Sequence, residues 1–325
     1  MKALVTGANG FTGSHLVKGL ESQNIDVVGL VRPTSNTERL AGTQAKLVYG
    51  DITDKSVVQQ GMEGVDWVFH TAAYVELGIV DADLMEKVNV EGTRTVLAVA
   101  SEAKIQKMVY CSTIGVFGDT QGQVVDESYQ RTQTDFSSPY DRTKYQAQQL
   151  VDEWAANGGP VVSVMPSGIF GIDDPHFRPI IERFLQGGLK VWAQSDRLTG
   201  IVHVDDLVDA MLLAAEKAAP GEHYIISAGE MTAREMFALI GTEAGGIAPP
   251  MEIPKPIVVL VGNILEVVGR VFSWNPPLSK ERLHYVYDRL VRVDGNKAKR
   301  ELGWQPRSPE TVLLEMTAQI QKELS

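Results

Sequence analysis

The fold is decided by the stretch Thr6-Gly7-Ala8-Asn9-Gly10-Phe11-Thr12-Gly13, in which a glycine recurs at every third residue. The apolar run 1–5 before it predicts a β-strand, and residues 15–20 after it open a helix. Glycine is needed there because a Cβ atom would block the approach of the backbone to a phosphate or force a costly φ. The stretch predicts a nucleotide-binding turn at a helix N-terminus, although the same spacing alone also occurs in ordinary turns.

A second signal lies in the run Tyr140-Asp141-Arg142-Thr143-Lys144. Ser138 and Pro139 before it are typical of a helix N-cap and a first helical residue. Residues four apart share one helix face, so the side chains of Tyr140 and Lys144 are expected to lie side by side. A pair of this kind in isolation is most often a surface contact. Here the same chain also carries the glycine turn and a polar strand end at 111–113.

Strand and helix patterns alternate along the first half of the chain. This alternation predicts an α/β fold with a doubly wound parallel sheet. The strands are expected at 1–6, 26–31, 46–49, 66–70, 107–112 and 161–165. The helices are expected near 13–22, 36–41, 54–61, 83–103 and 138–157. After Pro166 the pattern loosens, because prolines interrupt the helical runs.

Composition narrows the classes of function. The 325 residues carry a net charge of −11 and no basic run, which argues against a nucleic-acid surface. The single cysteine, Cys111, allows neither an intramolecular disulfide nor a cysteine-based metal cluster, and we expect a cytoplasmic protein with no metal site. The apolar stretch 257–268 is shorter than the roughly 20 residues of a membrane span. It predicts an amphipathic or buried helix, with a role at a membrane surface as the alternative.

These motifs together resemble the extended form of the short-chain dehydrogenase/reductase superfamily, the NAD-dependent epimerase/dehydratase family. The resemblance covers nearly the whole chain, in the family's usual order. Besides the glycine turn and the Tyr140 to Lys144 run, it is carried by 50–54, 70–73, 89–93, 109–113, 116–118, 166–171, 202–206 and 299–306. It implies an NAD(P)-dependent oxidoreductase that forms a homodimer through the helices at 83–103 and 138–157.

The resemblance also implies how the chain divides. Residues 1–165 would form a Rossmann dinucleotide-binding domain, to which segments near 201–228 and 290–300 return. Residues 166–200 and 229–325 would form mainly a smaller, discontinuous lobe that binds the substrate.

The resemblance assigns catalysis to Thr113, Tyr140 and Lys144. Tyr140 would act as acid and base on a carbonyl oxygen, and Lys144 is expected to lower the pKa of Tyr140 from its usual value of about 10. Thr113 would hydrogen-bond the substrate oxygen, with Ser112 in support. The cofactor would be bound by Gly7, Gly10, Phe11, Thr12, Gly13, Arg32, Asp51, Ile52, Thr71, Ala72, Ala73, Asn89, Ser112, Tyr140, Lys144 and Pro166.

The end of the second strand bears on the choice between NAD and NADP. An NAD site usually offers a carboxylate there for the ribose hydroxyls. This chain has Arg32, whose guanidinium can pair with a 2′-phosphate, so NADP(H) is favoured over NAD(H). The alternative is that Arg32 is a solvated charge at the strand end and that Asp51 and Ile52 alone hold the adenosine.

The same three catalytic residues serve several reactions. The family's dehydratases carry Asp-Glu directly after the catalytic threonine, whereas this chain has Ile114-Gly115. Arg32-Pro33, Tyr74 and residues 276–279 look more like the dihydroflavonol reductase and 3β-hydroxysteroid dehydrogenase branch. We therefore expect NADPH-linked reduction of an apolar ketone or aldehyde, or the reverse oxidation. Tyr74, Phe170 and His176 are candidate substrate contacts. A nucleotide-sugar epimerase and a non-catalytic NADP-sensing protein are the alternatives.

Overall fold

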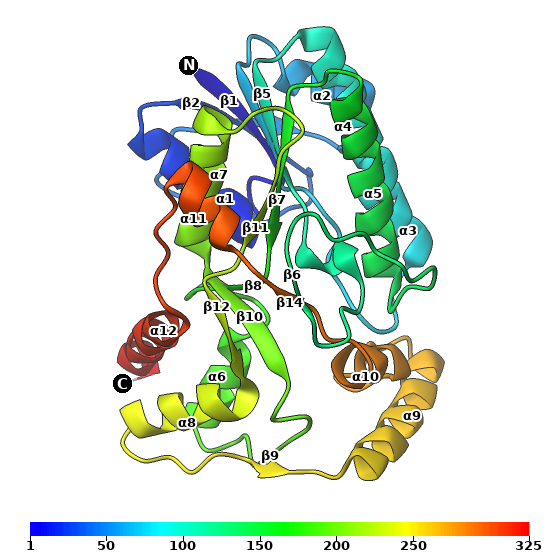
Figure 1. The fold of residues 1–325 in the computed structure, drawn as a ribbon, viewed down its shortest axis with the longest axis vertical. Coiled ribbons are helices and arrows are strands. Elements are labelled where there is room, and N and C mark those ends of the chain that lie inside the picture. Colours follow the sequence, from blue (N-terminus) through cyan, green and yellow to red (C-terminus); the bar gives the residue numbers. More distant parts are fainter. Residues whose placement is uncertain (325) are drawn as a thin grey trace.

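A seven-stranded parallel sheet forms the centre of the larger part of the molecule (Figure 1). The computed structural model describes residues 1–324. The strands follow the order β11-β7-β5-β4-β1-β2-β3, so the chain leaves β1 in one direction and later restarts on its other side at β4. The strands are β1 (Lys2–Thr6), β2 (Asp26–Val31), β3 (Lys46–Tyr49), β4 (Trp67–His70), β5 (Lys107–Cys111), β7 (Val161–Pro166) and β11 (His223–Ile226). In such sheets, ligands bind beyond the carboxyl ends of the strands at this point of reversal.

Helices cover both faces of this sheet, and each face has its own apolar core. One core joins the sheet to α1 (Phe11–Ser22), α7 (Val204–Lys217) and α11 (Asn296–Leu302). The other core joins it to α2 (Lys55–Gly61), α4 (Gly92–Ala103) and α5 (Pro139–Ala156). Because both faces are covered, the central strands are continuous buried runs rather than alternating ones, as in Ala3, Leu4 and Val5.

The predicted fold class is confirmed, and all six predicted strands lie in the sheet. Two helix predictions need correction. The segment 36–41 forms only a short 3-10 turn at Glu38–Leu40. The segment 83–103 begins as α3 (Ala82–Glu86), continues as a π-helical turn at Lys87–Glu91, and only then becomes α4. Single π-turns inside α-helices are often found at functional sites.

A smaller lobe lies at the carboxyl-end side of the sheet (Figure 1). Its three-stranded sheet has the order β12-β10-β8, from β8 (Gly168–Phe170), β10 (Leu198–His203) and β12 (Gly229–Thr232). An apolar core joins it to α6 (Arg178–Leu185), α8 (Ala233–Glu243) and α12 (Pro309–Leu324). The remaining elements are β6 (Val124–Val125) paired with β14 (Arg292–Val293), β9 (Val191–Trp192) paired with β13 (Met251–Glu252), α9 (Lys255–Val271) and α10 (Lys280–Tyr287).

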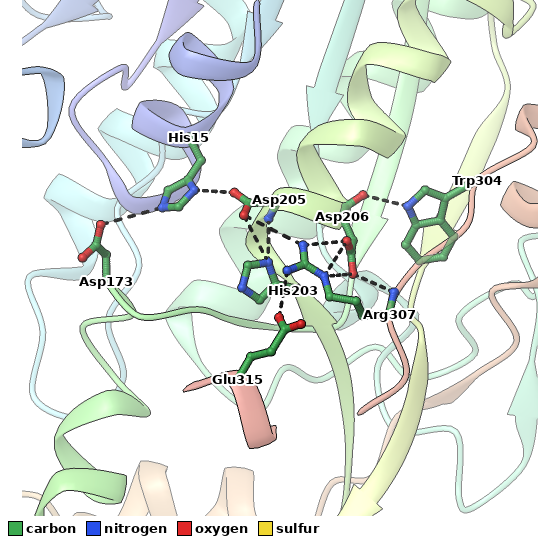
Figure 2. A network of polar contacts seen from close by, with 8 residues as sticks. All are labelled: His15, Asp173, His203, Asp205, Asp206, Trp304, Arg307 and Glu315. Carbon is green, nitrogen blue, oxygen red and sulfur yellow. Dashed lines mark hydrogen bonds and ion pairs between the residues drawn. The ribbon is translucent and has the colours of Figure 1, made fainter. Parts of the chain in front are cut away.

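A polar network joins the two parts at the start of α7 (Figure 2). The Arg307 guanidinium donates to both carboxylate oxygens of the buried residue Asp206. The Trp304 indole donates to the backbone carbonyl of Asp206 at 2.7 Å. His15 from α1 lies 2.6 Å from Asp205. These contacts fix the C-terminal segment and α1 against α7, so the lobe is anchored next to the glycine turn.

Candidate active site

The glycine turn has the backbone geometry that its spacing predicts. Gly7 has a φ of +69°, and a Cβ there would lie 2.8 Å from the Cα of Ala72. A Cβ on Gly13 would lie 2.1 Å from the Gly7 carbonyl oxygen. Gly10 precedes α1 and offers no side chain to cap its first N–H groups. The turn therefore packs tightly against the next strand end and leaves a helix N-terminus suited to a phosphate.

A cleft of about 550 Å³ opens at the carboxyl ends of β1, β2, β3 and β4. Nine of the residues that the sequence predicted for the cofactor or substrate line it: Gly7, Gly10, Arg32, Asp51, Ile52, Thr71, Ala72, Ala73 and Tyr74. The cleft thus collects the predicted glycine turn and the ends of three further strands at the reversal point of the sheet.

Other residues of the cleft were missed by sequence reasoning: Asn9, Leu30, Val31, Gly50, Val75, Leu84 and Val88. Asn9 and Gly50 lie inside motifs that were recognised. Leu84 and Val88 are one helical turn apart, and Leu84 is exposed although it is apolar. An apolar pair on the outer face of a helix is the sequence signal that indicates this wall of the cleft.

The strand ends beneath the cleft are held by buried hydrogen bonds around His70. Its Nδ1 lies 2.7 Å from the Thr6 hydroxyl, and its Nε2 lies 3.0 Å from the Thr93 hydroxyl. Burial, with a smaller effect of the Lys144 charge, lowers the pKa of His70 to about 3. The imidazole is therefore neutral at physiological pH and joins two neighbouring strands to α4.

Lys144 lies beneath the end of β5, in the part of α5 predicted to carry catalysis. Its ammonium donates to the Tyr110 hydroxyl and to the Cys111 carbonyl, both at 2.9 Å. The side chain is buried, and burial lowers the pKa of Lys144, although Tyr140 and Cys111 act in the opposite direction. Lys144 is thus held rigidly between a strand end and the helix that carries Tyr140.

Tyr140 lies in the first turn of α5, four residues before Lys144, and its side chain is partly buried. Burial raises the pKa of Tyr140, and the Lys144 charge offsets only part of that rise. The expectation of a lowered pKa is therefore not met. Lys144 acts in the expected direction, but the desolvation of the phenolate has the larger effect.

Thr113 begins the 3-10 turn Ile114–Phe117 that follows β5. Its hydroxyl accepts a hydrogen bond from the Gly115 N–H at 3.0 Å, and a Cβ on Gly115 would touch both Thr113 and Asp141. The turn therefore packs against the start of α5, beside Tyr140. Ser112 is buried directly before it, and its hydroxyl has no hydrogen-bond partner among the described residues.

Asn89 connects the cleft to α5. The Asn89 side chain accepts from the Tyr74 N–H at 2.7 Å and donates to the Tyr74 carbonyl at 3.1 Å. It also donates to the Thr143 hydroxyl at 3.0 Å, one residue before Lys144. Asn89 was predicted to bind the cofactor, but its amide is occupied by these contacts. It lies in the π-helical turn and positions Tyr74 relative to α5.

Several predicted site residues lie away from the cleft walls. Phe170 is 3% exposed in the core of the smaller lobe, where it stacks on Phe177, so it packs internally instead of facing the cleft. His176 is exposed, and its backbone N–H donates to the Asp174 carboxylate. Pro166 is buried in β7 beside β11. The Phe11 ring packs against His15 and Arg39, while Thr12 and Gly13 form the first turn of α1.

The raised pKa of Tyr140 predicts a pH profile. In the reaction expected from the sequence, carbonyl reduction needs the protonated Tyr140 phenol as donor, and a raised pKa keeps this phenol protonated at higher pH. We therefore expect kcat/KM for carbonyl reduction to stay flat between about pH 6 and pH 9, whereas alcohol oxidation, which needs the phenolate, should rise with pH. Initial rates in both directions at saturating cofactor check this. A reduction rate that falls with a midpoint near about pH 7 would contradict it.

Comparison with known proteins decides the family. The model of the NAD dependent epimerase/dehydratase family matches residues 3–227. This chain belongs to that family. It is an NAD(P)-dependent enzyme of the extended short-chain dehydrogenase/reductase type, as its motifs indicated.

Individual members are similar over almost their whole length. The 4-hydroxy-2-methyl-3-oxo-4-farnesyl-3,4-dihydroquinoline-1-oxide ketoreductase of Stigmatella aurantiaca is 33% identical, with 94% of this chain and 92% of that protein covered. The 3 beta-hydroxysteroid dehydrogenase/Delta 5-->4-isomerase of Mycobacterium tuberculosis is 32% identical, with 94% and 86% covered. The crystal structure of gox2253 has a TM-score of 0.84 and 30% identity, with 99% and 98% covered.

Described residues 1–324 include no helix that is both long and apolar enough to cross a membrane.

Proposed function

We propose that this epimerase/dehydratase family member is an NADPH-linked reductase of an apolar ketone or aldehyde, which also runs in reverse as an alcohol dehydrogenase. The observation that supports this most is the placement of Tyr140, Lys144 and Thr113 at the end of β5 and the start of α5. Strand β5 is the neighbour of β4, and the residues that follow β4 line the cleft at the reversal point of the sheet. The relatives named as a ketoreductase and as a hydroxysteroid dehydrogenase support an apolar substrate.

In this proposal each catalytic side chain has one task. The bound cofactor supplies the hydride. The Thr113 hydroxyl hydrogen-bonds the carbonyl oxygen and orients it, and Tyr140 gives its proton to that oxygen as negative charge develops there. Lys144 favours the resulting phenolate, because its buried ammonium lies one turn from the phenol and offsets part of the rise that burial causes in the pKa of Tyr140.

The residues beside Thr113 favour this chemistry over elimination of water. Ile114 and Gly115 occupy the positions where the family's dehydratases carry an acid and a base. The buried ion pair of Asp141 and Arg289 packs against Gly115. Arg289 also donates to the Gly115 carbonyl. Asp141 is thereby paired, and it is not available as a free acid or base.

The coenzyme preference is proposed to depend on Arg32. Arg32 is exposed directly after β2 and lines the cleft together with Asp51. Burial tends to raise the pKa of Asp51, but hydrogen bonds from Thr53 and the charges of Lys87 and Arg32 lower it overall. An exposed guanidinium there matches a ribose 2′-phosphate. The Asp51 carboxylate is available on the same wall of the cleft for the ribose hydroxyls.

We expect Arg32→Ala to weaken NADPH binding by roughly 10- to 100-fold, the equivalent of losing one charge-assisted hydrogen bond. The affinity for NADH should change little, because NADH has no 2′-phosphate. Titration of both coenzymes by fluorescence measures this, with Lys46→Ala, which removes another exposed charge near the sheet edge, as the matched control. Equal losses for both coenzymes would show that Arg32 does not select NADP.

The proposed reaction is tested by following NADPH consumption with aryl ketones, aldehydes, flavanonols, ketosteroids and UDP-sugars. We expect stoichiometric oxidation of NADPH with at least one apolar carbonyl. Isomerisation of a UDP-sugar without net coenzyme oxidation would identify an epimerase. Tight NADPH binding with no turnover across the panel would identify a sensing protein.

A further inference from the structure

The surface of α9 carries an apolar stripe that nothing else in the described chain covers. We define the stripe by its exposed apolar side chains: Ile257, Leu260, Val261, Ile264, Val267, Val268, Val271 and Phe272. Val267, Val271 and Phe272 are 64%, 70% and 74% exposed. Single exposed apolar residues are ordinary, but a contiguous group on one helix marks a surface that contacts another apolar phase.

The stripe is distinct from the face that packs inside the protein. At about 100° per residue, its members fall within a continuous arc of about 140°. The inner face lies elsewhere on the helix and carries the buried residues Val258, Gly262 and Gly269. A Cβ on Gly262 would meet Leu283 of α10 at 2.4 Å, and one on Gly269 would meet Ile79 at 3.0 Å. The two glycines thus allow α9 to pack closely against its neighbours, and the bulky apolar residues point outward.

Charges are absent from the arc, and the charged side chains on the rest of the helix are paired within the chain. Lys255 pairs with Asp288 at 3.2 Å, and Arg270 pairs with Glu266 at 2.8 Å. Trp274, 47% exposed, follows the C-terminal end of the helix. Aromatic side chains of this kind are enriched at the level of lipid headgroups. The stripe therefore matches an uncharged apolar phase bordered by a polar zone.

We propose that α9 docks this protein peripherally on a phospholipid bilayer, with the stripe inserted at the boundary between headgroups and acyl chains. Interfacial helices bind with their axis in the plane of the membrane and one apolar face buried. Figure 1 shows α9 at an outer edge of the smaller lobe, where it is free of the other helices except α10. A bilayer can close around such a protruding helix over the whole arc.

A second copy of the chain fits the stripe less well. Two convex helices touch along one line, which leaves the sides of a 140° arc in water. A specific dimer usually buries about 800 Å² on each partner and includes a polar rim with hydrogen bonds. The charged side chains beside the stripe are already paired within the chain. Helix α9 also lies apart from α4 and α5, which belong to the helices through which the resemblance implies dimerisation (Figure 1).

The docking face is coupled to the cleft wall. The Asn275 side chain, just beyond α9, accepts from the Ile79 N–H at 3.0 Å and donates to the Leu77 carbonyl at 3.0 Å. Arg282 of α10 pairs with Glu76 at 2.9 Å. The segment 76–79 follows Tyr74 and Val75, which line the cleft. Docking through α9 would thus hold this cleft-lining segment near the bilayer surface.

Vesicle flotation of the full chain tests the proposal without any activity measurement. The probe is phosphatidylcholine vesicles, and the variant is Ile264→Asp combined with Val267→Asp. We expect the wild-type protein to float with the vesicles and the variant to lose at least tenfold in partitioning. Binding should be insensitive to salt, because the margins of the stripe carry no net charge.

The matched control carries two aspartates at exposed apolar sites outside α9, Val124→Asp with Leu324→Asp, and should float like the wild type. Thermal melting and NADPH titration of all three proteins check that they are folded. Wild-type protein that stays in the aqueous fraction would overturn the proposal, as would equal flotation of the stripe variant. A vesicle-free dimer that the stripe variant dissociates would also overturn it and assign the stripe to a second copy.

Discussion

Tyr140→Phe is expected to lower kcat for carbonyl reduction by roughly 10²- to 10⁴-fold, the usual contribution of a positioned general acid. The variant keeps the ring that packs at the start of α5 and loses only the proton that the substrate oxygen must receive. The affinity for NADPH should therefore change by no more than a few fold. Steady-state kinetics and coenzyme titration on the same preparation measure both quantities.

Tyr145→Phe is the matched control for that experiment. Tyr145 lies on the same helix, one residue beyond Lys144, and packs against Phe136 and the Arg131 guanidinium. Its hydroxyl has no part in the proposed reaction, so kcat should stay near the wild-type value. If both variants lost activity equally, the effect would come from the packing of α5 and not from proton transfer.

Arg289→Met is expected to lower the free energy of unfolding by about 3–5 kcal/mol, the usual cost of removing one partner of a buried ion pair. The Arg289 guanidinium lies 3.2 Å from the Asp141 carboxylate, with the two side chains 5% and 2% exposed. The substitution leaves the Asp141 charge buried without compensation. Urea denaturation followed by circular dichroism measures the loss as a lower transition midpoint.

The double variant Arg289→Met, Asp141→Asn separates charge from packing. Removing both charges should restore a large part of the lost stability, because a neutral pair of similar size avoids the uncompensated charge. Arg292→Met is the control at a half-buried pair in the same segment, where Arg292 bonds Glu230, and it should cost clearly less. A double variant as unstable as Arg289→Met alone would mean that packing, not charge, holds the segment.

The features that were predictable from sequence are the local ones. The central strands were recognisable because each is a short apolar run buried on both faces, as in residues 2–6 and 161–166. The glycine turn was recognisable because the backbone around Gly7 and Gly13 excludes a Cβ. Tyr140 and Lys144 were recognisable because their spacing and the Ser138 cap define one helix face.

The features that sequence reasoning missed depend on contacts between distant segments. Nothing in the sequence around Arg289 indicates that it pairs with Asp141, and the two meet only when the segment that follows α10 reaches the first turn of α5. The role of Asn89 depends on a π-helical turn, which has no sequence signature in this chain. The charge of Lys144 was visible in the sequence, but the burial that raises the pKa of Tyr140 was not.

Phe170 and His176 were chosen as substrate contacts because aromatic and imidazole groups cluster in that part of the sequence. The structure buries one in the core of the lobe and exposes the other. The direction of each side chain is set by tertiary packing, which the residue types in the segment do not show. By contrast, Tyr74 lines the cleft because Asn89 holds its backbone there.

The most direct test of the account is the fate of deuterium from NADPH that carries deuterium at both hydrogens of the nicotinamide C4, with an apolar ketone as substrate. The account predicts one deuterium at the new carbinol carbon of the product for each NADPH consumed, and with Tyr140→Phe a rate of transfer that is lower by the same roughly 10²- to 10⁴-fold. Unlabelled product, or a nucleotide sugar isomerised while the labelled NADPH is recovered intact, would contradict it.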